Sequence, residues 1–278
     1  MQASQQPNND IRETVLWSLY NRVSGTGEAG ILHDPKAVEI YQSIDYDYEK
    51  SFGKPNNNMA IRSMLFDEAI LEFWREHPDG TVVNLGEGLE TQRYRLQDKK
   101  RKDATWITVD LPSGIFIREQ FMVPDDTHIH VASSAVDVSV WAQKVPLGKP
   151  VLITAQGLFM YLPEAEVKSL FQSVAKWFPG STLIFNAVSK FFSNRTMRGV
   201  QWTSDYTVPK MPFGVDRFDA PALFRSWVDD SLVVEEIPYP WEMTSGWRGY
   251  VGPLFKVPYL RAFAPKTIFR VTFPSARR

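Results

Sequence analysis

The sequence contains no cysteine among its 278 residues. Disulfide bonds, thiolate metal sites and cysteine nucleophiles are therefore excluded. An excess of charge of one sign is also missing, because 31 basic and 32 acidic side chains leave a formal net charge of −1. Such a balance gives no indication of a nucleic-acid partner or of attraction to an anionic membrane surface. We therefore expect neither partner.

Long hydrophobic runs are absent as well. No apolar segment approaches the ~20 residues that cross a bilayer, and the polar first ten residues lack the basic start and apolar stretch of a signal peptide. We therefore expect a cytoplasmic protein. Hydrophobic residues make up 44% of the chain and charged residues 23%, which is typical of a globular protein with a full core.

Histidine is scarce, and the sequence has only four. His128 and His130 alternate with apolar residues and would share one face of a strand, a spacing that a pair of metal ligands could use. No third ligand stands near them in the sequence, and isolated histidines are more often core or surface residues. We expect no metal.

Strand and helix signals alternate through most of the chain. Seven strands are expected near 82–85, 106–110, 128–132, 151–155, 182–187, 232–237 and 267–273. Helices are expected near 11–22, from Pro35 onward, and near 59–76, 89–100, 112–121, 137–143, 163–177 and 219–229. This alternation predicts an α/β fold with a mostly parallel sheet covered on both faces. No helix separates the last two strands, which predicts a closing antiparallel hairpin.

The predicted elements divide the chain unevenly within one structural domain. Residues 1–80 are read as an N-terminal helical cap, and residues 81–278 as a Rossmann-like core. Two long insertions rich in aromatic residues and proline, near 189–219 and 238–265, interrupt the alternation. Loops of that length in a compact domain are usually functional, so we expect them to form a lid over a substrate.

A glycine turn follows the first predicted strand. Gly86 and Gly88 would let the backbone approach a ligand closely, and Asp110 ends the next strand, where it could accept hydrogen bonds from a ribose. The third glycine of a dinucleotide fingerprint is replaced by Thr91. Glu87 and Glu90 beside the turn would repel phosphate. A ligand with a ribose but no phosphate fits better, and S-adenosylmethionine is such a ligand.

Several stretches, in the same order along nearly the whole chain, resemble the leucine carboxyl methyltransferase family. They match best its bacterial small-molecule branch, which includes polyketide O-methyltransferases. The matching stretches are Glu13–Arg22, His33–Ala37, Ile61–Asp67, Val83–Arg95, Val109–Pro112, Ala132–Asp137 with Trp141, Gln156–Pro163 and Pro212–Asp216.

The resemblance implies a class I methyltransferase fold that uses S-adenosylmethionine. Arg62 matches the family's arginine that holds the carboxylate of the cofactor's methionine tail, and Arg22 matches a basic position facing the same tail. The other cofactor residues that we expect are Gly86, Glu87 and Gly88 at the turn, Asp110 and Leu111 at the ribose, and Ser134 and Ala135 at the adenine.

Gln156 departs from the family pattern, which usually has glutamate at this position to bond the cofactor's ammonium. Glutamine can accept one such bond but carries no charge. The replacement indicates either weaker cofactor binding or a changed function. Simpler interpretations stand beside these roles: Arg62 as a snorkelling arginine, Asp110 as a helix cap, and Gln156 and Tyr161 as ordinary polar loop residues.

The acceptor is expected to be a small natural-product-like molecule, for which the aromatic insertions would line a pocket. The expected substrate residues are Phe159, Tyr161, Arg195, Arg198, Trp202, Tyr206, Phe213 and Trp247. A carboxylate with a pKa of ~4 is already ionised at pH 7, whereas a phenol with a pKa of ~10 needs a base. No histidine lies in the insertions, so we favour methyl ester formation, assign no general base, and name Arg195, Arg198, Lys210 or Arg217 as anchors.

Other functions remain open. The same fold could methylate nitrogen or a phenol, or a protein C-terminus as in the family's eukaryotic branch. It could also have lost turnover and kept binding. A nicotinamide dehydrogenase is disfavoured by Thr91 and by the lack of a Tyr-x-x-x-Lys pair. A homodimer is expected because it is common among such enzymes.

Overall fold

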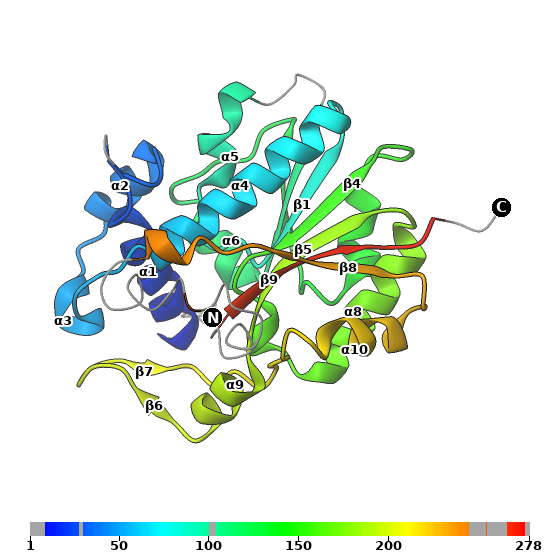
Figure 1. Cartoon of the computed structure of the whole chain (residues 1–278). Coiled ribbons are helices and arrows are strands. Elements are labelled where there is room, and N and C mark those ends of the chain that lie inside the picture. The colour runs from blue at the N-terminus through cyan, green and yellow to red at the C-terminus, as the bar shows by residue number, and fades with distance from the viewer. Residues whose placement is uncertain (1–8, 28–29, 100–103, 245–253, 255–265, 276–278) are drawn as a thin grey trace, which may run out of the picture.

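A computed structural model of the chain describes residues 9–27, 30–99, 104–244, 254 and 266–275. Its centre is a seven-stranded sheet with the strand order β3-β2-β1-β4-β5-β9-β8 (Figure 1). The strands are β1 (Thr81–Leu85), β2 (Trp106–Asp110), β3 (His128–Ala132), β4 (Val151–Ala155), β5 (Thr182–Val188), β8 (Val233–Ile237) and β9 (Lys266–Thr272).

The first five of these strands are parallel, and β9 runs antiparallel to both β5 and β8. This arrangement confirms the predicted α/β class, the seven strands and the antiparallel closing pair. Parallel strands in such a sheet are buried on both faces, and every residue of β1 and β4 is buried.

Helices cover the two faces of the sheet. They are α1 (Asn9–Val23), α2 (Pro35–Ser43), α3 (Tyr48–Phe52), α4 (Asn58–Glu76), α5 (Gln92–Arg95), α6 (Pro112–Arg118), α7 (Val138–Trp141), α8 (Glu164–Trp177), α9 (Lys190–Met197) and α10 (Ala220–Trp227). Because successive strand residues point to opposite faces, Val82 and Val83 belong to different hydrophobic clusters. Val82 packs with α4, and Val83 packs with α7, α8 and α10.

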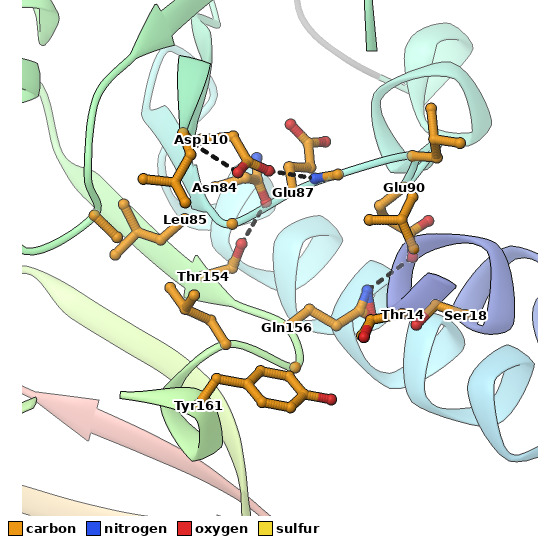
Figure 2. A pocket seen from close by; sticks show the side chains of 18 of the residues that line it. Thr14, Ser18, Asn84, Leu85, Glu87, Glu90, Asp110, Thr154, Gln156 and Tyr161 are labelled. Atoms are coloured by element: carbon orange, nitrogen blue, oxygen red, sulfur yellow. Dashed lines mark hydrogen bonds between the residues drawn. The ribbon is translucent and has the colours of Figure 1, made fainter. Parts of the chain in front are cut away.

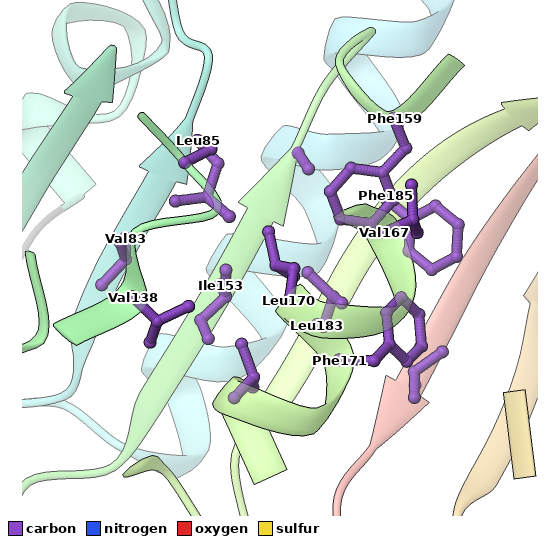
Figure 3. Packing of buried hydrophobic residues seen from close by; sticks show 14 of the residues in the cluster. Val83, Leu85, Val138, Ile153, Phe159, Val167, Leu170, Phe171, Leu183 and Phe185 are labelled. Atoms are coloured by element: carbon purple, nitrogen blue, oxygen red, sulfur yellow. The ribbon is translucent and has the colours of Figure 1, made fainter. Parts of the chain in front are cut away.

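The apolar positions of α8 recur at helical spacing and face the sheet (Figure 3). Val167, Leu170, Phe171 and Val174 are all fully buried against the strands. Phe171 stacks on Phe224 of α10 with ring centroids 4.9 Å apart. This layer fixes the position of β4 and β5, whose carboxyl ends lie beside the pocket described below.

One predicted helix is largely wrong. Residues 89–100 were expected to be helical, but α5 has only four residues and is followed by a short 3-10 turn at Gln97–Lys99. The hydroxyl of Thr91 donates to Asp34 at 2.6 Å, and the carbonyl of Leu89 accepts from Arg22 at 2.8 Å. These tertiary contacts hold the chain in an irregular turn where local periodicity favours a helix.

The sequence also failed to predict α3, α9 and a two-stranded hairpin of β6 (Val200–Gln201) and β7 (Thr207–Val208). The last two lie within the first expected insertion, 189–219. Most of the second insertion lies outside the described residues. The division into a cap and a core stays a prediction. Within the described part of the chain, no helix has both the length and the apolar character needed to cross a membrane.

Candidate cofactor site

A pocket of about 420 Å³ lies at the carboxyl ends of β1, β2 and β4, next to α1 and α4 (Figure 2). Ligands of open α/β sheets bind at this edge. All ten predicted cofactor residues line it, together with Tyr161 from the predicted substrate set. The ten are Arg22, Arg62, Gly86, Glu87, Gly88, Asp110, Leu111, Ser134, Ala135 and Gln156.

The glycine turn has the conformation that its sequence predicts. Gly86 has φ 65° and Gly88 has φ 51°, both in the left-handed region that favours glycine. A Cβ atom on Gly86 would also lie 2.9 Å from Leu158 Cδ1. Side chains at these positions would therefore strain the turn and narrow the pocket.

Asp110 connects the end of β2 to the turn. Its Oδ2 accepts from the backbone N–H of Gly88, and its Oδ1 accepts from that of Leu111, both at 2.7 Å. Burial raises the pKa of Asp110, and the two backbone hydrogen bonds counteract part of this rise. Asp110 thus lies where a ribose ligand is expected and also holds the turn in place.

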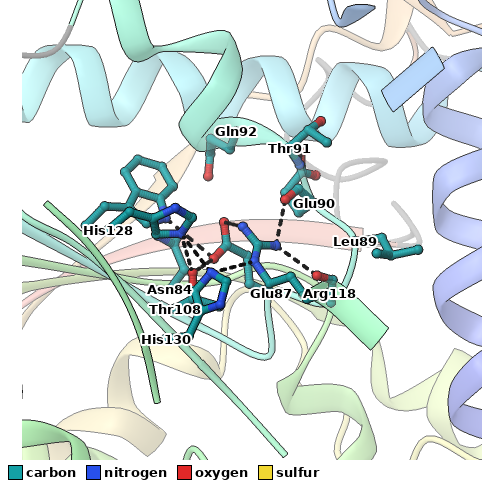
Figure 4. A network of polar contacts seen from close by, with 12 residues as sticks. Asn84, Glu87, Leu89, Glu90, Thr91, Gln92, Thr108, Arg118, His128 and His130 are labelled. Atoms are coloured by element: carbon teal, nitrogen blue, oxygen red, sulfur yellow. Dashed lines mark hydrogen bonds and ion pairs between the residues drawn. The ribbon is translucent and has the colours of Figure 1, made fainter. Parts of the chain in front are cut away.

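A buried ion pair lies beneath the turn (Figure 4). Arg118 Nη2 is 3.2 Å from the Glu87 carboxylate, which also accepts from the hydroxyl of Thr108. Arg118 Nη1 donates to the carbonyls of Gly88 and Glu90, both at 2.8 Å. Burial raises the pKa of Glu87, and Arg118 counteracts the rise. This arginine therefore links α6 to the backbone of the cofactor turn.

His128 and His130 extend the network below the turn. Their Nε2 atoms lie 3.3 Å apart, and His128 Nε2 is 3.0 Å from the hydroxyl of Thr108. Burial, with Arg118 and His130, lowers the pKa of His128 to about 2, so this imidazole is neutral at pH 7. Among the residues that the structure describes, no group of three potential ligands gathers.

Glu90 is the most heavily bonded carboxylate of the pocket wall. It accepts from Arg95 at 2.6 Å, Ser63 at 2.8 Å and Gln156 at 2.9 Å, and it pairs with Arg22 at 3.2 Å. Burial alone would raise the pKa of Glu90, but the two arginines outweigh it and hold this pKa well below its usual range. Glu90 is therefore ionised at neutral pH.

Arg62 differs from the other arginines around the pocket. No carboxylate of the described chain lies within ion-pair distance of its guanidinium, whereas Arg22, Arg95 and Arg118 each have such a partner. Arg62 Nε, like Arg22 Nε, is also buried without a hydrogen-bond partner. Burial lowers the pKa of Arg62, and Glu90 counteracts this. A buried cation without a partner is costly. At a pocket wall, it indicates a place for an anionic group of a ligand.

The other predicted substrate residues do not line the pocket as the structure describes it. Phe159 and Phe213 are fully buried in the main hydrophobic cluster. Tyr206 is buried in a second cluster, where its ring meets Phe52 at 4.9 Å edge to face. Trp202 is half exposed and donates to the carbonyl of Phe52 at 3.2 Å. Phe159, Tyr206 and Phe213 pack into hydrophobic clusters, so the geometry gives no support to direct substrate contacts.

None of the four expected anchors lines the described pocket. Arg195 and Arg198 lie exposed on and just after α9, and Lys210 is exposed. Arg217 is buried and donates to Glu236 at 2.8 Å. The remaining predicted residue, Trp247, lies outside the described residues.

Six polar residues of the pocket wall were not predicted as site residues: Thr14, Ser18, Asn84, Glu90, Gln92 and Thr154. Asn84 and Thr154 end neighbouring strands and hydrogen-bond to each other, and Thr14 and Ser18 lie on α1. For Thr14, Ser18, Asn84 and Thr154, a signal was present in the sequence. Asn84 and Thr154 interrupt apolar strands near their carboxyl ends, and Thr14, Ser18 and Arg22 recur every four residues, which places them on one helix face.

Solved structures with this fold include methyltransferases. A protein from Thermobifida fusca described as a methyltransferase superposes with a TM-score of 0.54 at 13% identity, covering 94% of each chain. An S-adenosylmethionine-dependent methyltransferase from Clostridium acetobutylicum gives 0.50 at 12% identity, covering 87% of this chain and 99% of that one. With the strand order and the pocket, these structures define the class I methyltransferase fold.

The family follows from the sequence comparison. Residues 24–175, more than half of the chain, match the family model described as leucine carboxyl methyltransferase. The chain belongs to this family, whose methyltransferases use S-adenosylmethionine.

Two curated relatives show similar coverage. The tetracenomycin polyketide synthesis O-methyltransferase TcmP of Streptomyces glaucescens is 29% identical over 64% of this chain and 66% of its own length. The S-adenosyl-L-methionine-dependent methyltransferase dpfgK of Gibberella zeae is 23% identical over 61% and 62%. Both matches span a little less than two thirds of the relative's length.

The residues of the pocket fit S-adenosylmethionine. Arg62 is a cation without an ion-pair partner in the described chain and would be available to the carboxylate of its methionine tail. Asp110 lies at the strand end expected for the ribose, and the glycine turn leaves the backbone open to close approach. When bound, this cofactor would supply an electrophilic methyl group on a sulfonium.

Proposed function

We propose that this protein is an S-adenosylmethionine-dependent O-methyltransferase that converts a carboxylate of a small, largely apolar molecule into a methyl ester. The observation that supports this choice is the lack of a general base on the described pocket wall. Its carboxylates belong to Glu87, Glu90 and Asp110, and each already accepts from neighbouring donors.

The other ionisable groups near the acceptor side do not change this conclusion. Burial raises the pKa of the Tyr161 hydroxyl to about 12, so it stays protonated at neutral pH. No histidine lines the described pocket, and residues 245–265 contain no histidine, aspartate or glutamate. A carboxylate acceptor with a pKa of ~4 needs no base, because it is ionised before it binds.

The work left to the protein is then positioning. Holding two reacting groups in line can supply about 7 to 11 kcal/mol of a barrier. The side of the pocket beyond the turn combines apolar side chains, Leu158, Leu162 and Pro209, with the hydroxyl of Tyr161. Such a wall suits a flat apolar acceptor. The name of the Streptomyces relative supports an O-methylated polyketide-like molecule.

The test uses S-adenosylmethionine labelled on its methyl group with matched panels of aromatic acids and phenols. We expect label to pass to an acid, and mild alkali to release it as methanol, because esters hydrolyse under conditions that leave ethers and amines intact. Label that resists alkali would contradict the carboxylate proposal and identify phenolic O- or N-methylation.

A tyrosine variant serves as an internal check on the base. Loss of a general base typically costs 10²- to 10⁴-fold in rate. We expect Tyr161→Phe to lower kcat by less than about tenfold, because its hydroxyl does not take up a proton in the proposed reaction. A drop within the larger range, with unchanged affinity for S-adenosylhomocysteine, would assign Tyr161 a proton-transfer role.

A further inference from the structure

Gln156 and Glu90 meet in the wall of the pocket (Figure 2). Gln156 Nε2 donates to Glu90 Oε2 at 2.9 Å. Because an ionised carboxylate can only accept hydrogen bonds, the amide nitrogen must face Glu90 and the amide oxygen must face away. Ser63 lies 2.8 Å from Glu90 and 3.4 Å from Gln156 Oε1, so its single proton goes to Glu90. Gln156 Oε1 therefore keeps the capacity to accept.

Glu90 belongs to a buried chain of charges with a net charge of its own. Arg22 pairs with Asp34 and Glu90, and Arg95 pairs with Asp34, Asp67 and Glu90. Burial raises the pKa of Asp67, but Arg95 and Gln92 together give it three N–H donors, the arrangement of an ionised carboxylate. Three carboxylates and two guanidiniums leave one negative charge. Of the three carboxylates, only Glu90 lines the described pocket.

The opposite charge lies on the same pocket wall. Arg62 carries a cation that no carboxylate of the described chain pairs. The pocket thus presents one positive group without an ion-pair partner and one network with an excess negative charge. A zwitterionic α-amino acid end, with a carboxylate and an ammonium on adjacent atoms, matches this pair of charges.

We propose that Glu90 supplies the negative charge for the ammonium of the cofactor's methionine tail, and that Gln156 is the neutral amide that orients this ammonium through its Oε1. This inference rests on the proposed cofactor. It also accounts for a neutral residue at position 156, where the family usually has glutamate, because Glu90 already places a carboxylate in the same pocket wall.

A glutamate at position 156 would then not improve cofactor binding. Gln156→Glu would place a second carboxylate about 3 Å from Glu90, and like charges at that distance cannot both stay ionised without a cost. The substitution that restores the usual family residue is therefore expected to weaken cofactor binding or leave it unchanged.

The experiment compares two ligands by calorimetric titration: S-adenosylhomocysteine and its deaminated analogue, which lacks the α-ammonium. We expect Glu90→Gln to weaken S-adenosylhomocysteine about tenfold or more, in the range of a lost charge-assisted hydrogen bond, and to leave the analogue within about twofold. The control is Glu87→Gln, a carboxylate of the same turn that pairs with Arg118. It is expected to change both affinities by the same factor.

Two further variants extend the test, and the first of them does not depend on the stability of Glu90→Gln. Gln156→Glu alone should bind S-adenosylhomocysteine no more tightly than the unmodified protein. The double variant Glu90→Gln with Gln156→Glu should recover the preference for the ammonium that Glu90→Gln loses.

The contrary outcomes are distinct. Equal weakening of both ligands by Glu90→Gln would make Glu90 a purely structural residue and overturn the inference. Tighter binding by Gln156→Glu would show that residue 156 lacks a charge that nothing replaces, and would also overturn it. Failure of the unmodified protein to bind S-adenosylhomocysteine at all would refute the proposed cofactor, and the inference with it.

Discussion

Arg62→Met should make the protein more stable and less able to bind its cofactor. Arg62 Nε is buried without a hydrogen-bond partner, and its guanidinium has no carboxylate partner in the described chain. Methionine keeps the length and much of the apolar stem of the side chain but removes the charge and the donors. The free protein loses an unfavourable group, whereas the complex loses its partner for the ligand carboxylate.

The two effects have different sizes. Leaving a buried donor unsatisfied costs about 1 to 3 kcal/mol, so the free protein should gain about 1 kcal/mol and melt about 2 °C higher. Hydrogen bonds to charged groups contribute about 1.5 to 3 kcal/mol. At about 1.4 kcal/mol per factor of ten, the affinity for S-adenosylhomocysteine should fall about 10- to 150-fold.

The assay combines urea unfolding of the ligand-free protein with equilibrium binding of S-adenosylhomocysteine. The matched control is Arg75→Met, on the exposed side of the same helix, α4. It removes the same charge and should change neither quantity by more than about 0.5 kcal/mol. If Arg62→Met instead destabilised the free protein and left the affinity intact, Arg62 would be a structural residue and the proposed orientation of the methionine tail would be wrong.

Two other variants test the surroundings of the site. Gly157→Ala adds a methyl group 2.9 Å from Arg62 Nη1 at a residue with φ 78°. We expect the free energy of unfolding to fall by about 1 to 2 kcal/mol and cofactor affinity to fall as well. An unchanged affinity would show that Arg62 can move without affecting cofactor binding. His128 should make the protein less stable in acid, because its pKa of about 2 in the folded state lies below the unfolded value of 6.5, so only the unfolded chain takes up the proton as pH falls below 6.5. Through this one residue, the free energy of unfolding should fall by about 2 kcal/mol between pH 6.5 and 4.5. His128→Asn should make stability depend less on pH in that range. An equally steep dependence in the variant would assign the loss to other groups.

Much of the fold could be predicted because the relevant information is local. The apolar runs that became β1 and β4 are short, bounded by turn residues and buried on both faces, so burial and sequence pattern agree. The failure at residues 89–100 has a tertiary cause. Arg22 and Asp34, more than fifty residues upstream, form hydrogen bonds with Leu89 and Thr91. These hydrogen bonds hold residues 89–91 in a turn, so the helix begins only at Gln92.

In the candidate site too, features set by local sequence could be predicted and features set by tertiary packing could not. The pocket wall around the glycine turn was predictable, because the positions of Gly86, Gly88 and Asp110 follow from strand ends and from backbone conformation. Their contacts with the cofactor stay a prediction. The substrate residues were not predictable, because aromatic residues in an insertion can equally join hydrophobic clusters of the rest of the protein, as Phe213 and Tyr206 do. Nothing in a single sequence reports whether such rings face a cavity or one another.

The contact between Glu90 and Gln156 could also not be predicted from the sequence. Glu90 and Gln156 lie 66 residues apart, and their contact exists only because the turn after β1 and the loop after β4 share one edge of the sheet. The sequence identified Gln156 as a departure from the family pattern, and the structure identifies the carboxylate beside it.

A crystal structure of the complex with S-adenosylhomocysteine tests the central claim most directly. We predict the adenosine at the end of β2 with its ribose hydroxyls on Asp110, the tail carboxylate on Arg62, and the ammonium next to Gln156 Oε1. A ligand bound elsewhere, or a tail that leaves Arg62 without a partner, would contradict the account.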